Sequence, residues 1–157
     1  MLIEFIEYLT FENIYLWTNS AILPFWLMLI FIPNSKITTF FINSVILPLI
    51  LSTIYIFIVY RIFQLDEPLY NVFYLYLSLD NLSTIFASES FLLIFWVHFI
   101  SINIFLGSWV SRDAIKYNIS KRTVFVPLIL IYFMGPIGLV YYWFIRIFYA
   151  KKIIFHD

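Results

Sequence analysis

Four long runs without a formal charge dominate this sequence of 157 residues. Residues 13–35, 37–60, 90–111 and 123–145 contain no Asp, Glu, Lys or Arg. An α-helix rises about 1.5 Å per residue, so roughly 20 apolar residues cross the ~30 Å hydrocarbon core of a bilayer. Each run is therefore long enough for one membrane crossing. The sequence predicts an all-α fold, a four-helix transmembrane bundle whose charges gather between the spans.

The composition supports a membrane protein and argues against several other classes. The chain is 64% hydrophobic and only 11% charged, whereas a soluble domain is about a quarter charged. Four spans with short connections use most of the length, which predicts a single integral membrane domain over residues 1–157. A net charge of zero without a basic tract argues against a nucleic-acid partner. The chain has no cysteine, and we expect neither a metal ion nor another cofactor.

We place the spans at about residues 14–32, 39–63, 91–110 and 124–149. Between the second and third spans, apolar residues recur at helical spacing in a stretch too short to cross a bilayer. They are Leu69, Val72, Phe73, Tyr76 and Leu77. We therefore predict a short interfacial helix between spans two and three.

The orientation depends on the Lys and Arg residues that flank the spans. With four spans, the two termini share one side with Arg61, Arg146, Lys151 and Lys152, and five basic residues lie on the other side. The numbers of Lys and Arg on the two sides are nearly equal, so the positive-inside rule alone favours neither orientation strongly. Because the N-terminus has no Lys or Arg and the third connection is basic, we predict that both termini lie outside a bacterial inner membrane.

The third span carries most of the polar residues found inside an apolar run. Such groups are costly in a membrane and usually face the interior of a bundle. His98 is the one intramembrane group that titrates near neutrality. It is a candidate proton donor or acceptor. The alternatives are a neutral histidine bonded to a neighbouring helix and, less favoured because a metal site needs several ligands, a metal or haem ligand. Asp113, beside Arg112 at the membrane exit, is the second candidate acid–base group.

Aromatic and small residues of the first and third spans are candidate ligand contacts. Trp26, Trp96 and Trp109 suit either a flat apolar ligand or packing and an aromatic belt at the interface. Asn103 and Gly107 lie one helical turn apart. That spacing is typical of a close-packed helix pair, and the alternative is contact with a substrate oxygen.

The fourth span contains a break at its middle. Gly135, Pro136 and Gly138 fall within four residues, and two of them are among the three glycines of the chain. A break of this kind exposes a carbonyl and lets another helix or a flat ligand approach the backbone. The sequence leaves kinked packing and a cavity wall as the two interpretations.

Four blocks in chain order carry a resemblance to a known family. They are residues 23–34 (LPFWLMLIFIPN), 96–100 (WVHFI), 105–109 (FLGSW) followed by Arg112 and Asp113, and 134–139 (MGPIGL). Together they resemble the neoxanthin-synthase-like (abscisic-acid-deficient-four-like) family of small integral membrane proteins, with this chain a bacterial-type member. The resemblance covers about residues 14–148. The third-span blocks and MGPIGL are its specific parts.

The resemblance implies an isomerase that acts on an epoxy-carotenoid or a related isoprenoid, because plant members are required to convert violaxanthin to neoxanthin. Opening an epoxide to an allene needs an acid at the oxygen and a base at a vinylic C–H. The titratable groups that would serve as catalytic residues are His98 and Asp113. One departure concerns Asn103, which stands where we expect an acid in the family's Phe-Asp-Leu-Phe motif.

Two functions of different classes follow from the sequence. The first is a membrane protein that binds, and isomerises, a carotenoid or another isoprenoid lipid. Its predicted substrate-binding residues are Trp26, Trp96, Asn103, Gly107, Trp109, Arg112, Gly135, Pro136 and Gly138. The alternative is a non-catalytic interaction or assembly protein. The expected partners are membrane lipid, an isoprenoid included, and a second copy or another membrane protein.

Overall fold

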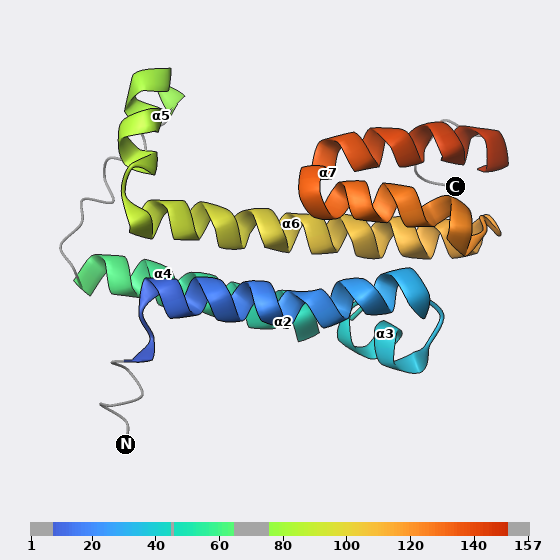
Figure 1. Ribbon diagram of the computed structural model, residues 1–157, viewed down its shortest axis with the longest axis horizontal. Coiled ribbons are helices and arrows are strands. Elements are labelled where there is room, and N and C mark those ends of the chain that lie inside the picture. Colours follow the sequence, from blue (N-terminus) through green and yellow to red (C-terminus); the bar gives the residue numbers. More distant parts are fainter. Residues whose placement is uncertain (1–7, 45, 65–75, 151–157) are drawn as a thin grey trace. The chain divides into compact units, whose positions relative to one another are not determined.

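The computed structural model of the chain describes residues 8–44, 46–64 and 76–150. Within these ranges it contains six helices and no strand, which confirms the predicted all-α class (Figure 1). The helices are α2 (Phe11–Phe31), α3 (Lys36–Phe41), α4 (Ile46–Gln64), α5 (Leu79–Phe86), α6 (Glu89–Lys116) and α7 (Lys121–Ala150). By length and composition, α2, α4, α6 and α7 can each cross a membrane, as the charge-free runs predict.

Large apolar side chains lie exposed on all four long helices. Ile56, Phe63, Phe105 and Phe144 each expose more than half of their surface. No more than 39% of any candidate span is buried inside the protein. Apolar patches of this extent are unfavourable in water and favourable in hydrocarbon. The chain is therefore an integral membrane protein in contact with lipid.

The second charge-free run forms two helices rather than one. Ser35 caps α3, since its Oγ accepts a hydrogen bond from the Thr38 N–H at 3.0 Å. The Thr38 hydroxyl in turn donates to the Ile32 carbonyl at 2.8 Å, which ties α3 to the end of α2. The span expected to begin near residue 39 begins instead at Ile46. Pro48 then falls in the first turn of α4, where an N–H has no partner within the helix.

α5 lies between spans two and three, but not on the apolar stripe that the sequence singled out. Leu69, Val72 and Phe73 lie outside the described residues, and Tyr76 and Leu77 precede the helix. The cap of α5 is Ser78, whose Oγ accepts a hydrogen bond from the Asn81 N–H at 3.1 Å. A short helix in this segment is thus observed, and its interfacial position stays a prediction.

The chain divides into two compact units. Unit 1 comprises residues 1–21 and 49–99, and unit 2 comprises residues 22–48 and 100–157. The apolar core of unit 1 joins α2, α4 and α6 through pairs one helical turn apart. Its members are Ile14, Ile58, Ile62, Leu93 and Val97. The single membrane domain expected from length stays a prediction.

Unit 2 contains a tight connection between α6 and α7. Asn118 has a φ of 54°, in the left-handed region that Asn tolerates better than most residues. The N–H of Ile119 donates to the Ala114 carbonyl at 2.9 Å, which completes a Schellman motif. Ser120 then caps α7, with its Oγ accepting from the Thr123 N–H at 3.3 Å. These caps bring the end of α6 and the start of α7 together.

α7 consists of two legs that reverse direction at Met134, whose φ of −142° and ψ of 53° are not helical. Before the break, the Tyr132 carbonyl lies 3.5 Å from Nδ2 of Asn103 on α6. After the break, Arg146 contacts Asp113, about three turns closer to the C-terminal end of α6. The first leg therefore runs back along α6 and the second returns toward the α6–α7 connection (Figure 1).

The predicted break within residues 124–149 is present, and the chain reverses there to form a hairpin of two legs. Gly135 leaves no room for a Cβ, because such an atom would collide with Oδ1 of Asn103. Pro136 has no N–H to offer a carbonyl across the break. The glycine allows the close approach to α6, and the proline prevents the helix from closing over the reversal. Gly138 packs against Ile131 of the first leg in the same way.

Candidate functional site

A buried polar cluster joins the return leg of α7 to the end of α6. Oδ2 of Asp113 accepts a hydrogen bond from Nε of Arg146 at 2.8 Å and one from the Tyr142 hydroxyl at 2.7 Å. Nη2 of Arg146 donates to the Tyr117 hydroxyl at 3.2 Å, and the guanidinium lies over the Tyr117 ring. Trp109 makes an edge contact with Tyr142 at a centroid distance of 5.9 Å.

The pairing in this cluster is deeply buried. The side chains of Arg146 and Asp113 expose only 1% and 10% of their surface. A charge with so little contact with water is stabilised mainly by its ion-pair and hydrogen-bond partners. Asp113, predicted as a catalytic acid or base, is therefore engaged in an ion pair that holds the hairpin against α6.

Two predicted binding residues of the third span lie in close helix packing. A Cβ on Gly107 would lie 2.7 Å from the Trp26 ring, so the glycine lets the indole lie directly on α6. Trp26 is 3% exposed and meets the Tyr132 ring edge-on. Asn103 is 4% exposed and sits against Gly135 at the turn of the hairpin. The structure thus brings Trp26, Asn103, Gly107 and Gly135 together in contacts that join α2, α6 and α7.

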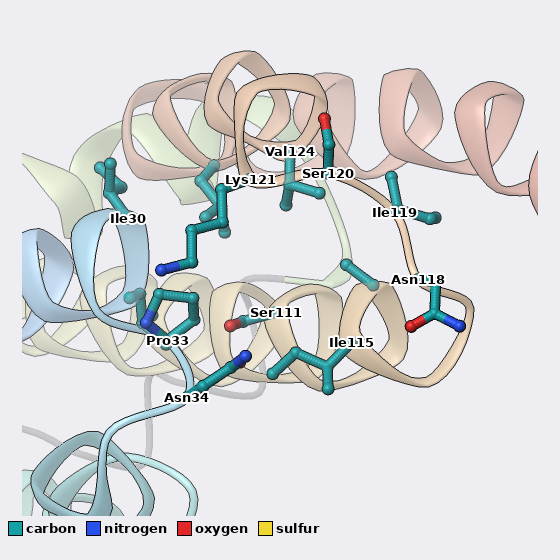
Figure 2. Close-up of a pocket in the computed structure, with 13 residues that line it drawn as sticks. Ile30, Pro33, Asn34, Ser111, Ile115, Asn118, Ile119, Ser120, Lys121 and Val124 are labelled. Atoms are coloured by element: carbon teal, nitrogen blue, oxygen red, sulfur yellow. The ribbon is translucent and has the colours of Figure 1, made fainter.

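A pocket of about 260 Å³ opens in unit 2 beside these contacts (Figure 2). It lies at the end of α2, the end of α6 and the start of α7. Leu29, Val124 and Leu128 give it an apolar wall. Its polar lining comes from the connections between helices, from one residue of α6 and from the first residue of α7. These polar residues are Asn34, Ser111, Asn118, Ser120 and Lys121.

Ser111 is the unusual residue of this lining. It is 2% exposed, and its Oγ is buried without a hydrogen-bond partner. The Lys121 ammonium makes one long contact, at 3.4 Å, with the Phe31 carbonyl. Figure 2 shows the Lys121 side chain extending toward Pro33, with the Ser111 hydroxyl and the Asn34 amide on the same side of the pocket. A ligand with oxygen acceptors would satisfy these donors, since an unpaired buried hydroxyl is unfavourable.

The other predicted catalytic residue, His98, belongs to unit 1. Its side chain is exposed on α6, and about four turns of helix separate it from Asp113. Also in unit 1, Trp96 donates its indole N–H to Oδ1 of Asn19 at 3.1 Å and contacts the Tyr15 ring. Trp96 and Tyr15 line an apolar groove of about 530 Å³ together with Leu92. No described contact joins His98 to Asp113 as an acid–base pair.

The remaining predicted residues lie around the end of α6 and the hairpin turn. Arg112 is exposed beside Asp113, and Pro136 is exposed next to the buried Gly135. Gly138 is buried between the legs of α7. Among the residues that the structure describes, no group of three or more His, Cys, Asp or Glu could hold a metal ion.

Sequence reasoning missed four residues that the structure brings into these sites. Tyr142 and Arg146 are the partners of Asp113, and Ser111 and Lys121 line the pocket. One signal was present in the chain. The break at Gly135 divides the fourth charge-free run into halves of roughly 12 residues, each too short to cross a bilayer. Two short halves indicate a helical hairpin, which would carry Arg146 back toward Asp113.

Comparison with known proteins confirms the family resemblance that the four sequence blocks indicate. The family model described as ABA4-like, for ABA DEFICIENT 4-like, matches residues 13–142. Over 125 residues the chain is 28% identical to "Protein ABA DEFICIENT 4, chloroplastic" of Arabidopsis thaliana, which covers 78% of this chain and 55% of that protein. No solved structure matches. The family match spans most of the chain and includes Ser111, Asp113 and both glycines of the hairpin, so the chain belongs to the ABA4-like family of membrane proteins.

Proposed function

We propose that this protein binds an isoprenoid lipid, of the carotenoid class or a related one, with the polar end of the ligand in the pocket of Figure 2. The observation that carries the proposal is the buried Ser111 hydroxyl, which lines the pocket without a hydrogen-bond partner. An apolar wall with a few convergent polar groups is typical of sites for small organic ligands. The similarity to a protein named ABA DEFICIENT 4, together with the family resemblance of the sequence, supports an isoprenoid as that ligand.

Binding is better supported than isomerisation. Epoxide isomerisation needs an acid and a base beside the ligand. Asp113 is occupied by Arg146 and Tyr142, and His98 lies in the other unit. Asn103, where the family motif is expected to have an acid, has its side chain against Gly135 and the Tyr132 carbonyl. We therefore assign binding to the pocket, and an isomerase would need an acid other than these residues.

A matched pair of variants tests the binding proposal. Val124 is buried at the pocket wall, whereas Val126, two residues further on α7, exposes 45% of its surface. The protein is purified from carotenoid-producing cells, and its bound lipid is extracted and identified by chromatography and mass spectrometry. We expect the parent and Val126→Phe to carry an isoprenoid and Val124→Phe to lose it. A parent protein without isoprenoid, or equal loading of both variants, would contradict the proposal.

A gentler variant guards against misfolding of Val124→Phe. Ser111→Ala removes only the hydroxyl, so the fold should persist while retention of the ligand falls. Incubation of the parent with an epoxy-carotenoid then tests catalysis, because formation of an allenic product would restore the isomerase hypothesis.

A role in membrane assembly is the second candidate function, and the packing of Trp26 on Gly107 favours it. Residues predicted to line a ligand site are in direct contact with each other there. If assembly is the function, a partner protein should co-purify with the parent and with Ser111→Ala. It should be lost when exposed apolar side chains of the helices, such as Phe105 on α6, are replaced by alanine.

We further propose that the α6–α7 connection faces the cytoplasm. Because α7 returns on itself, Arg146 lies beside Asp113 at this end of α6. The described residues of unit 2 then contain six basic residues and one acid, Asp113. The basic ones are Lys36, Arg112, Lys116, Lys121, Arg122 and Arg146. The positive-inside rule places such an end in the cytoplasm. The N-terminus then lies outside, as the sequence predicts, whereas the end of α7 lies inside.

A further inference from the structure

The polar lining of the pocket in Figure 2 consists of hydrogen-bond donors and neutral groups, without a carboxylate among its lining residues. Lys121 brings a positive charge, and Ser111 brings a hydroxyl whose buried oxygen has no partner. The Asn34 amide lies on the same side. A neutral alcohol or epoxide would not require the ammonium group. This combination therefore fits a ligand group that carries several acceptor oxygens and a negative charge.

The first turn of α7 strengthens this preference. Ser120 and Lys121 line the pocket at the point where α7 begins. The first N–H groups of a helix have no partner within it and carry a partial positive charge. Phosphate groups bind at such ends for this reason. Here the helix end is joined by the partnerless Ser111 hydroxyl on a different helix, so two separate elements present donors to one cavity.

The charges of unit 2 point the same way. Asp113, the one acid among its described residues, is paired with Arg146. No unpaired carboxylate of the described part of this unit therefore opposes an anion in the pocket.

The opposite side of the pocket is apolar. Leu29 comes from α2, and Val124 and Leu128 come from the first leg of α7. A free inorganic ion would leave this wall without a contact, whereas a lipid tail would cover it. We propose that the pocket binds a phosphate ester carried on a lipid tail. This inference rests on the proposed isoprenoid function for the tail and adds the identity of the end group.

The test compares ligands that differ in one part only. Farnesyl phosphate and farnesol share an isoprenoid tail and differ in the phosphate. Phosphatidylglycerol keeps a phosphate ester on a different tail, and inorganic phosphate has no tail. Binding of each to the full-length protein in dodecyl maltoside micelles, which contain no phosphate ester, is measured by native mass spectrometry. We expect farnesyl phosphate to bind at least about tenfold more tightly than farnesol, as charge-assisted hydrogen bonds imply.

Two exposed cations on adjacent positions provide the matched control. Lys121→Gln should remove most of the difference between farnesyl phosphate and farnesol, whereas Arg122→Gln, outside the lining, should retain it. Both residues are exposed, so neither change should unfold the protein. Ser111→Ala should weaken farnesyl phosphate binding without a change in charge.

The outcomes separate this inference from the proposed function. Equal affinity for farnesol and farnesyl phosphate would overturn the phosphate inference and leave isoprenoid binding intact. Equal affinity for phosphatidylglycerol and farnesyl phosphate, both above farnesol, would support the phosphate inference and contradict the isoprenoid preference. Binding of inorganic phosphate as tight as that of farnesyl phosphate would overturn the lipid part of the inference.

Discussion

The guanidinium of Arg146 donates from Nε to Oδ2 of Asp113 at 2.8 Å, across 33 positions of the chain. The contact exists because α7 reverses at Met134, and it fixes the end of the return leg beside α6. Both side chains are almost fully buried, so each charge depends on the other.

Removal of one partner of this pair should destabilise the protein strongly. We expect Asp113→Ala to lower the free energy of unfolding by about 3–5 kcal/mol, because Arg146 is left as a buried, uncompensated charge. The double variant Asp113→Leu with Arg146→Met should recover much of the loss. Unfolding in detergent, followed by circular dichroism, measures both. Arg112→Met, at the exposed neighbouring position, is the control and should stay within about 0.5 kcal/mol of the parent.

The hairpin predicts a labelling pattern that a straight fourth span cannot give. The chain has no cysteine, so single cysteines report without background. Lys116→Cys and Tyr149→Cys should react with a membrane-impermeant maleimide from the same side of the bilayer, and Tyr8→Cys from the other side. All three positions are exposed. Labelling of Tyr149→Cys from the same side as Tyr8→Cys would mean that α7 crosses the membrane once.

The contact of Trp26 with Gly107 should resist any enlargement of the glycine. A Cβ at residue 107 would lie 2.7 Å from the indole, so we expect Gly107→Ala to cost about 1–3 kcal/mol of unfolding free energy through overpacking. Trp26→Leu should shrink that cost when it is combined with Gly107→Ala. A double-mutant cycle measures the coupling, and strictly additive effects would argue against the contact.

Asn103→Asp tests whether the acid expected in the family motif can be restored here. The change removes the amide donor to the Tyr132 carbonyl and places a carboxylate at a site that is 4% exposed. We expect a loss of about 1–3 kcal/mol or more in unfolding free energy, since a buried acceptor without a donor is unfavourable. Asn103→Leu, which has a similar size and no charge, is the comparison. An Asp variant as stable as the parent would indicate a polar cavity at this position.

The long helices could be predicted from the sequence because hydrocarbon imposes one length on every span. Runs without charge are a local property, and α2 and α6 follow them closely. The separate helix α3 was harder to foresee, since its position against α2 depends on the hydrogen bond from Thr38 to the Ile32 carbonyl. Such bonds depend on how two helices meet, which hydropathy does not record.

The candidate site could be predicted only in part, for a related reason. The sequence predicts that other helices pack closely at Asn103, Gly107 and Gly135, and these residues do lie in close helix–helix contacts. The roles of Arg146 and Ser111 depend on which segments, distant in the sequence, pack beside them in the folded chain. A Gly-Pro pair permits a kink, a wide bend or a reversal, and the choice is made by contacts such as Arg146 with Asp113. Only the folded chain brings those partners together.

The reversal of α7 also bears on how the protein is made. Synthesis delivers α6 to the membrane before the return leg exists, so Asp113 first meets the bilayer without Arg146 or Tyr142. Until the last leg folds back, a bare carboxylate remains near hydrocarbon, which is an unfavourable state. Folding of the return leg onto α6 is therefore a late step in the assembly of this region. Chains truncated after the first leg should be recognised as unfinished and degraded, even though three long apolar helices are already in place.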